Sequence, residues 1–281
     1  MAIPSKGRLV APTLELLNNA GLRLQVYDDR ALVVQTNWQG LSIIRVRPED
    51  IPSIVESGSV SLGITGLDYV YESKASVKVI ERLGFGRGRL VLAVAAGSGI
   101  GSVDELPDGA RVATKYVNIT REYFDKLGKP VRIVKISGSA EVMPLLGVAD
   151  AIVDVMSTGT TLRLHGLKPI GVLMESEAVL ISPVNGVRCG DVVESAVLMI
   201  RGALASKGRK LVLINVPEGK LGEVLSIMPA MEGPTVADIA GKPFKEVISV
   251  VPEESLPTLL TRLKRAGAKD ILVLDIEKVI P

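Results

Sequence analysis

The sequence is poor in the residues that carry several common chemistries. One of its 281 residues is a cysteine, Cys189, and one is a histidine, His165. A single cysteine excludes an intrachain disulfide, and a single histidine excludes a metal site built from several histidines. The 33 Lys and Arg nearly balance the 31 Asp and Glu without a long basic run, so no footprint for nucleic acid or an anionic membrane is present. We expect a reduced, cytoplasmic setting and an anion that is bound locally.

Long apolar runs and aromatic residues are also scarce. No run reaches the ~18 apolar residues of a membrane span, and the N-terminal MAIPSKGRL has Lys and Arg where a signal peptide needs its apolar core. Aromatic residues make up 3% of the chain, whereas hydrophobic residues make up 47%. Because Val, Ile, Leu, Ala and Gly dominate, the composition is typical of strands covered on both faces by helices. We therefore expect an α/β fold.

Strand and helix patterns alternate along most of the chain. A first β, α, β block is followed by a second one, and an extended run after it could lead back into the first domain. The expected strands are 1–5, 41–47, 60–66, 89–95, 110–116, 131–137 and 150–156, the expected helices are 8–21, 50–58, 118–128, 139–149 and 160–167, and the extended run is 170–182.

The last part of the chain reads as a separate unit with an internal duplication. Small and basic residues interrupt the pattern at 202–210, and about 70 residues follow, enough for a small domain. NVPEGKLGEVL at 215–225 matches VVPEESLPTLL at 250–260, with Val-Pro-Glu between a strand and a helix in each copy. With further strands at 234–239, 243–250 and 269–279 the order is βαββαβ, which is ferredoxin-like. Chance convergence of two good helix starts remains the alternative.

The stretch DVMSTGTTL, residues 154–162, carries the clearest chemical signal. A strand ends there, and four hydroxyl residues around Gly159 turn into a helix, so backbone N–H groups and hydroxyls can hold a phosphate monoester. Asp154 has the wrong charge for a phosphate but can accept hydrogen bonds from sugar hydroxyls. Capping of a helix needs only one hydroxyl. The loop therefore favours a ribose 5-phosphate.

This loop is similar to that of phosphoribosyltransferases, and ISGSAEVMPLLGVADAIVDVMSTGTTLRLHGL resembles the signature of the ATP phosphoribosyltransferase family, the first enzyme of histidine biosynthesis. AIPSKGRL, RVRPEDIP, LGITGLDYV, LGFGRGRLVLAV, MPAMEGPTV and GAKDILVLDIEKVI extend the resemblance over nearly the whole chain, with Ala230 and Gly233 where the family has a glycine and a serine. The resemblance implies transfer of phosphoribosyl from phosphoribosyl pyrophosphate to N1 of ATP, with release of pyrophosphate and a requirement for Mg. It also implies the long form of the enzyme, which histidine feedback-inhibits. The implied assembly is a homo-hexamer, or a dimer exchanging with a hexamer.

The resemblance further implies an architecture and a set of site residues. A two-lobed core resembling periplasmic binding proteins would comprise lobe I, 1–84 with 176–204, and lobe II, 85–175, followed by a C-terminal ferredoxin-like regulatory domain at 207–281. No dedicated metal ligand and no general base are assigned. Phosphoribosyl pyrophosphate would be held by Glu141, Asp154, Ser157, Thr158, Gly159, Thr160 and Thr161, ATP or pyrophosphate by Lys6, Gly7, Arg8, Arg47, Gly66 and Asp68, and histidine by Thr235.

Other interpretations remain at several positions. His165 is better explained as structural, Arg87 and Arg89 either line a hinge or are simply exposed, and Thr235 could merely start a strand. A nucleobase phosphoribosyltransferase of the other common fold usually has two adjacent acids in its loop, whereas Asp154 stands alone. A sensor without catalytic activity would bind ligand without turnover, but no DNA-binding helix pair accompanies the chain.

Overall fold

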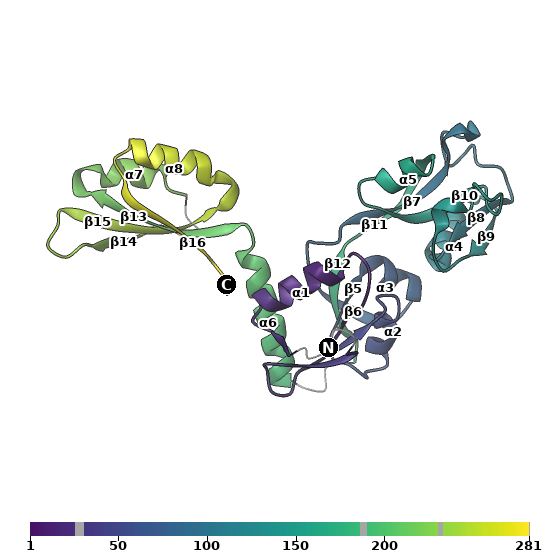
Figure 1. Cartoon of the computed structure of the whole chain (residues 1–281), viewed down its shortest axis with the longest axis horizontal. Coiled ribbons are helices and arrows are strands. Elements are labelled where there is room, and N and C mark those ends of the chain that lie inside the picture. Colours follow the sequence, from purple (N-terminus) through teal and green to yellow (C-terminus); the bar gives the residue numbers. More distant parts are fainter. Residues whose placement is uncertain (26–30, 186–189, 230–232, 281) are drawn as a thin grey trace. The chain divides into compact units, whose positions relative to one another are not determined.

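The structure, a computed structural model, describes residues 1–25, 31–185, 190–229 and 233–280. The chain divides into two compact units (Figure 1). Unit 1 comprises Met1–Asn18 and Leu22–Glu194, and unit 2 comprises Asn19–Gly21 and Ser195–Pro281. No helix among the described residues is long and apolar enough to cross a membrane.

Unit 1 contains a seven-stranded sheet with the strand order β2-β3-β4-β1-β5-β12-β6. The three central strands β4, β1 and β5 are parallel, and β3, β12 and β6 run antiparallel to their neighbours. The strands are β1 (Ala2–Pro4), β2 (Leu24–Gln25), β3 (Val33–Thr36), β4 (Ser42–Val46), β5 (Gly63–Gly66), β6 (Val77–Arg82) and β12 (Ala178–Pro183), and the helices are α1 (Val10–Asn19), α2 (Ile51–Glu56) and α3 (Leu67–Ser73).

Burial of apolar side chains fixes α2 on this sheet. Ile51 and Val55 of α2 are fully buried and pack in one cluster with Val179 and Ile181 of β12. Gly63 on β5 allows this close approach, because a Cβ at its position would lie 2.7 Å from the side chains of both α2 residues. The sequence therefore needs glycine inside this strand.

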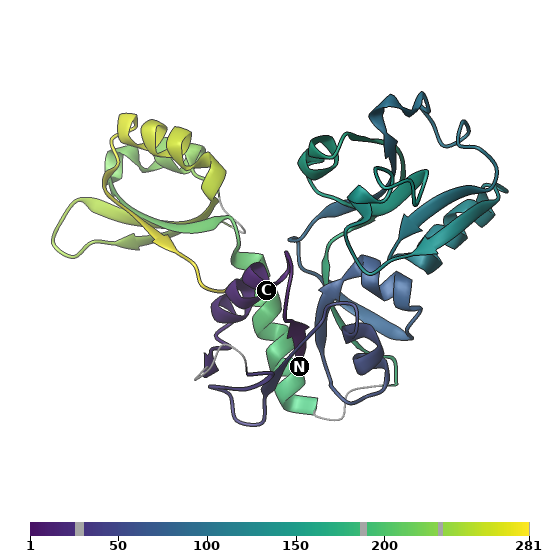
Figure 2. The same cartoon turned by 45° about the vertical axis from the view of Figure 1, so that its right-hand side comes forward.

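Unit 1 also contains a five-stranded sheet with the order β11-β7-β10-β8-β9. Strands β10, β8 and β9 are parallel, and β7 runs antiparallel to both β10 and β11. Two buried clusters, one with Phe124 of α4 and one with Leu162 of α5, take alternate residues of β7 and β10, so the helices cover opposite faces (Figure 2). The elements are β7 (Gly88–Ala95), β8 (Ala110–Thr114), α4 (Val117–Lys126), β9 (Val131–Lys135), β10 (Ala151–Met156), α5 (Thr160–Leu164) and β11 (Leu167–Ser176), with 3-10 turns at Ala96–Ser98 and Ala140–Val142.

The chain passes between the two sheets of unit 1 at two places. It leaves the first sheet after Arg82 at the end of β6 and enters the second at Gly88 of β7. It returns at Glu177, the residue between β11 and β12. The predicted α/β fold with a two-lobed core is confirmed, whereas the residue boundaries given above for the lobes and the C-terminal domain remain predictions.

Unit 2 has the βαββαβ order expected from the duplication, which confirms the ferredoxin-like prediction. Its sheet is antiparallel with the order β14-β15-β13-β16. Val212 and Val216 of β13 pack with Leu259 and Leu263 of α8 on the helix-covered face. The elements are α6 (Gly190–Ser206), which begins in unit 1, β13 (Arg209–Pro217), α7 (Leu221–Ile227), β14 (Thr235–Asp238), β15 (Phe244–Pro252), α8 (Leu256–Arg265) and β16 (Lys269–Asp275), with 3-10 turns at Glu218–Lys220 and Glu253–Ser255.

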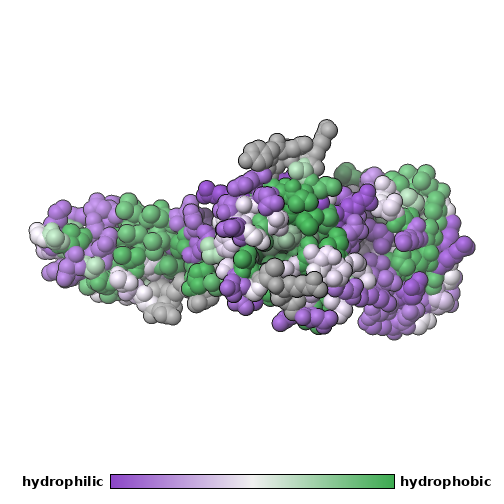
Figure 3. All heavy atoms as spheres, turned by 90° about the horizontal axis from the view of Figure 1, so that it is seen from below, coloured by the Kyte–Doolittle hydropathy of each residue, from purple (hydrophilic) through white to green (hydrophobic). Residues whose placement is uncertain are grey.

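The other face of this sheet carries hydrophobic side chains in cross-strand rows. Leu213 lies opposite Ile248 on β15 and Leu272 on β16, and Leu211 lies opposite Val250 and Leu274 in the same way. Leu272 and Leu274 are 58% and 45% exposed. Figure 3 shows hydrophobic residues gathered over the C-terminal unit on the side seen there. We call these six residues the open apolar face.

Strands β2, β3 and β6 were not predicted from the sequence, and two predicted segments differ in the structure. The helix expected at 139–149 is only a 3-10 turn, Ala140–Val142, because Ser139 is left-handed with φ 53° and Pro144 cannot donate a backbone hydrogen bond. The interruption expected at 202–210 begins later, since α6 continues to Ser206 and the break comes at Gly208, with φ 71°. Small residues such as Ala203 and Ala205 are good helix formers, and they do not mark a linker here.

Candidate functional site

Basic residues follow the parallel strands at the carboxyl edge of the first sheet. Lys6, Gly7 and Arg8 come after β1, and Arg47 comes after the adjacent β4, where Ser5 N–H donates to the Val46 carbonyl at 2.8 Å. Carboxyl ends of parallel strands meet at one edge, where ligands of open α/β sheets gather. Gly7 has φ 82°, which suits a tight turn that needs glycine. The structure thus brings these predicted residues to one edge.

Lys6 is already paired at this edge. Its ammonium lies 3.2 Å from Glu49, and both side chains are partly exposed. Burial works to raise the pKa of Glu49, but a hydrogen bond from its own backbone and the contacts with Lys6 outweigh burial and lower that pKa. Arg8 and Arg47 are exposed, and neither has an ion pair among the described residues. Arg8 and Arg47 therefore have guanidinium groups free for an anion.

The hydroxyl-rich loop follows β10 directly. Ser157, Thr158, Thr160 and Thr161 are exposed, and the Thr158 and Thr160 hydroxyls lie 3.1 Å apart. Gly159 has φ 76°, and a Cβ there would come within 3.1 Å of Met156 Sδ and 3.3 Å of an Arg163 nitrogen. Because α5 is only five residues long, its helix dipole is weak, so the hydroxyl and backbone N–H groups are the main donors that the loop offers to an anion.

A cavity of about 220 Å³ brings the predicted sugar and phosphate residues together. Asp154 and residues 155–162 form one side, Glu141 contributes from the 3-10 turn, and Arg8 contributes from the edge of the first sheet. Lys6, Gly7, Arg47, Gly66 and Asp68 are not among its lining residues. The cavity therefore joins two carboxylates, a guanidinium and four hydroxyls around a space of sugar size.

Asp154 is half-buried beside this cavity. Its Oδ1 accepts the N–H of Val155 at 2.8 Å. Burial raises the pKa of Asp154, and the negative Glu141 adds to the rise, whereas the Val155 N–H, Lys115 and Arg8 act to lower it. The net direction is upward. A carboxylate in this setting depends on nearby cations to remain ionised.

Lys115 is a residue that sequence reasoning missed. It follows β8, which runs parallel to β10 with Thr114 level with Val153, so Lys115 comes level with Asp154. Its ammonium lies 5.6 Å and 5.1 Å from the ring centroids of Tyr69 and Tyr116, and donates to the Tyr69 hydroxyl at 3.4 Å. Burial works to lower the pKa of Lys115, but Tyr69, Asp154 and Asp68 outweigh burial and raise it. Its place at the carboxyl end of an expected strand was the available signal.

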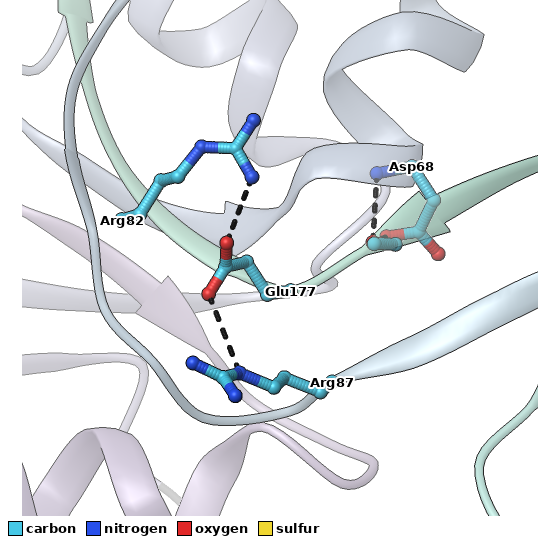
Figure 4. Close-up of polar contacts among 5 residues, drawn as sticks. Asp68, Arg82, Arg87 and Glu177 are labelled. Atoms are coloured by element: carbon cyan, nitrogen blue, oxygen red, sulfur yellow. Dashed lines mark hydrogen bonds and ion pairs between the residues drawn. The ribbon is translucent and has the colours of Figure 1, made fainter.

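Asp68 is buried, with 1% exposure, and binds protein groups (Figure 4). Its Oδ1 accepts the Ser176 hydroxyl at 2.7 Å, its Oδ2 accepts the Tyr116 hydroxyl at 2.8 Å, and its N–H donates to Ser176 Oγ at 3.1 Å. Burial and the nearby Asp68 raise the pKa of Tyr116, so its hydroxyl remains a donor. Gly66 makes room for this carboxylate, since a Cβ there would lie 2.1 Å from Asp68 Oδ1.

Other predicted positions lie elsewhere. His165 is exposed at the end of α5, and Thr235 is exposed at the start of β14, opposite Ile248. Cys189 and Ala230 lie outside the described residues. Among the residues that the structure describes, no group of three or more His, Cys, Asp or Glu side chains could hold a metal ion.

The fold defines an α/β protein with a two-lobed core and a C-terminal ferredoxin-like unit, and the hydroxyl-rich loop after β10 lines a cavity in that core. Comparison with known proteins specifies it further. The family described as ATP phosphoribosyltransferase matches residues 47–202, and the C-terminal domain of the same family matches residues 206–278. The chain belongs to the ATP phosphoribosyltransferase family, which are pentosyltransferases of histidine biosynthesis.

Individual relatives match the sequence of this chain over its whole length. The ATP phosphoribosyltransferase of Pyrobaculum calidifontis is 55% identical over 280 residues, which is 100% of this chain and 99% of that protein. Those of Ignicoccus hospitalis and Sulfurisphaera tokodaii are 53% and 49% identical, each with 99% of its length matched. The solved ATP phosphoribosyl transferase (HisG:HisZ) complex from Thermotoga maritima has a chain 27% identical with a TM-score of 0.61, covering 71% of this chain and 96% of that one.

Proposed function

We propose that the protein transfers the phosphoribosyl group of phosphoribosyl pyrophosphate to N1 of ATP. In this reaction the bond from adenine N1 to ribose C1 forms, the bond from C1 to the pyrophosphate oxygen breaks, and pyrophosphate leaves with the electron pair. The observation that carries the proposal is the cavity where Arg8, Glu141 and Asp154 meet the loop of residues 157–161.

The residues divide this work according to their chemistry. Asp154 and Glu141 accept hydrogen bonds from the ribose hydroxyls, and Ser157, Thr158, Thr160 and Thr161 donate to the 5-phosphate. Gly159 permits close backbone approach. Lys6, Gly7, Arg8 and Arg47 form the side that faces ATP or pyrophosphate, where the guanidinium groups suit phosphate oxygens. Gly66 and the buried Asp68 support the same sheet edge. Asp68 contributes indirectly, through the hydrogen bonds that it accepts from Tyr116 and Ser176.

The proposed reaction does not require a general base to activate its nucleophile. Acceleration then comes from holding two anionic substrates in line and from stabilising the departing pyrophosphate. Nucleophilic attack by adenine N1 uses its own lone pair, so the chemistry does not need a histidine. His165 is exposed at the end of α5 and has no place in this scheme.

The cavity chemistry fits magnesium brought by the substrates. Mg²⁺ prefers one or two carboxylates together with substrate phosphates over a cage made only of protein ligands. Asp154 and Glu141 line the same cavity and offer two such carboxylates. Bound magnesium would neutralise charge on the pyrophosphate, while Asp154 and Glu141 would orient the ribose beside it.

We further propose that histidine inhibits the enzyme through unit 2 and that the enzyme assembles as a hexamer or as a dimer exchanging with a hexamer. Thr235 is exposed and available for a small ligand.

The open apolar face supports self-association, because burying its rows of hydrophobic side chains, including the exposed Leu272 and Leu274, is energetically favourable. Light scattering with and without histidine tests the assembly, and a monomer under both conditions contradicts it.

The experiment that tests the reaction mixes the protein with ATP, phosphoribosyl pyrophosphate and Mg, and follows the ultraviolet absorbance of the adenine ring. Wild type should form product, whereas Asp154→Ala and Thr158→Ala should raise the KM for phosphoribosyl pyrophosphate or abolish turnover while remaining folded. Asp125→Ala, an exposed residue on α4, is the control and should behave as wild type. Ligand binding without turnover by wild type would favour a sensor.

The histidine proposal has its own test. A chain ending before Lys207 should lose sensitivity to histidine, and Thr235→Val in the full chain should weaken inhibition without changing uninhibited turnover. The full-chain variant matters because the truncated chain could fail to fold. Undiminished inhibition of a folded truncated protein would overturn the regulatory role of the tail.

A further inference from the structure

A second cavity lies beside the same loop and has no role in the scheme above. Its volume is about 370 Å³, and it shares Met156 and Ser157 with the smaller cavity. Its lining includes Arg82 at the end of β6, Arg87 in the first crossing segment between the sheets and Arg89 on β7. We call it the arginine cavity. Because Ser157 borders both cavities, a ligand seated in one can extend toward the other.

Glu177 holds two of the arginines beside each other. Its side chain is 14% exposed, and its Oε1 accepts Arg82 Nη1 at 2.8 Å while its Oε2 lies 3.9 Å from Arg87 Nε. In Figure 4 the two guanidinium groups lie on opposite sides of this carboxylate. Glu177 is itself fixed, because its backbone carbonyl accepts the N–H of Leu67 at 2.9 Å. The Glu177 carboxylate thus acts as a shared counter-ion, which reduces the repulsion between the guanidinium groups of Arg82 and Arg87.

Arg89 supplies a cation that protein groups do not neutralise. It lies opposite Met156 on one neighbouring strand and Glu175 on the other, yet forms no ion pair or side-chain hydrogen bond with any described residue. Arg89 and Glu175 are both exposed. The lining therefore carries three guanidinium groups against two carboxylates, and one of those carboxylates is already engaged by two arginines.

We propose that the arginine cavity is a second anion subsite, which binds the polyphosphate of a substrate whose ribose phosphate or reacting group sits at the smaller cavity. Guanidinium groups match phosphate oxygens in pairs, and several arginines spread over one cavity suit a chain of phosphates better than a single one. The identification of the anion rests on the proposed function. Its two possible sources are the pyrophosphate of phosphoribosyl pyrophosphate and the triphosphate of ATP.

Calorimetric titration of the full-length protein with inorganic tripolyphosphate and with pyrophosphate tests binding without any turnover. Loss of one charge-assisted contact corresponds to about tenfold weaker binding, so Arg89→Gln and Arg87→Gln should each weaken the tighter-binding probe by about tenfold. Arg132→Gln is the matched control, since Arg132 is an exposed arginine of β9 outside both cavities and should leave the affinity unchanged.

Steady-state kinetics with the same variants distinguishes the two sources. A raised KM for ATP alone assigns the cavity to the triphosphate, and a raised KM for phosphoribosyl pyrophosphate alone assigns it to the pyrophosphate. Wild-type binding and kinetics in both variants, or an equal loss in Arg132→Gln, would overturn the subsite. Absence of turnover in wild type, with arginine-dependent binding of tripolyphosphate retained, would instead contradict the proposed reaction and keep the subsite.

Discussion

Removal of one hydroxyl, in Tyr116→Phe, tests the buried hydrogen bonds around Asp68. Tyr116 and Asp68 are each 1% exposed, and their hydrogen bond of 2.8 Å joins the start of α4 to α3. The substitution keeps the ring but leaves Asp68 Oδ2 without its donor in a site that water does not reach. A lost hydrogen bond to a carboxylate costs about 1.5–3 kcal/mol, so we expect the free energy of unfolding to fall by about 2 kcal/mol.

Urea unfolding followed by tryptophan fluorescence measures this change. Trp38 is the only tryptophan and lies in unit 1, the unit that contains Tyr116 and Asp68. Tyr123→Phe is the control, because the Tyr123 hydroxyl has no hydrogen bond to any described residue, and its effect should remain within about 0.5 kcal/mol. Adding Asp68→Asn completes a double-mutant cycle, which should show coupling of the two side chains. Equal effects of the two tyrosine substitutions, or no coupling, would refute the reasoning.

Three further changes test other parts of the site. Lys115→Met removes a cation that lowers the pKa of Asp154, leaving burial and Glu141, which raise it, opposed by the Val155 N–H and Arg8. Because the proposed contact with the ribose uses the ionised Asp154 carboxylate, the Met variant should lose affinity for phosphoribosyl pyrophosphate at a higher pH than wild type as pH falls. Lys115→Arg should restore the wild-type profile, and an unshifted profile in the Met variant contradicts the role of Lys115. Gly66→Ala places a Cβ 2.1 Å from Asp68 Oδ1 and should lower the urea midpoint clearly more than Gly97→Ala, which meets no atom within 4 Å. Asp154→Asn should raise the KM for phosphoribosyl pyrophosphate and flatten the acid side of its pH profile, and a KM and profile like those of wild type would exclude Asp154 from ribose binding.

Local patterns in the sequence predicted much of this structure. The loop after β10 was recognisable because a buried apolar strand, an acid and four hydroxyls around Gly159 are contiguous. The ferredoxin-like tail was recognisable because Val-Pro-Glu repeats at the same point of each half. Both depend on short-range order, which periodicity and capping reveal directly.

Features that depend on tertiary contact were missed or misread. The helix expected at 139–149 is a different kind of miss, since its causes, Ser139 and Pro144, are local and were outweighed by an otherwise apolar pattern. Lys115 of ATKYVN gives only the signal of its place near the end of an expected strand, and its surroundings are defined when β8 lies beside β10 and two tyrosine rings flank its ammonium. Likewise, Arg82, Arg87 and Glu177 meet only because the chain crosses between the sheets twice.

The placement of Asp68 changes how the turn after β5 should be understood. An acid at a strand end was expected to face the ligand, yet both of its oxygens are occupied by Ser176 and Tyr116, and it is not exposed. Tyr116 in turn lies under the ammonium of Lys115, which is level with Asp154. We therefore expect Asp68 to influence the proposed site indirectly, by fixing the tyrosine whose ring contacts this lysine. Replacement of Asp68 should consequently disturb stability first, and substrate affinity only as far as Lys115 moves.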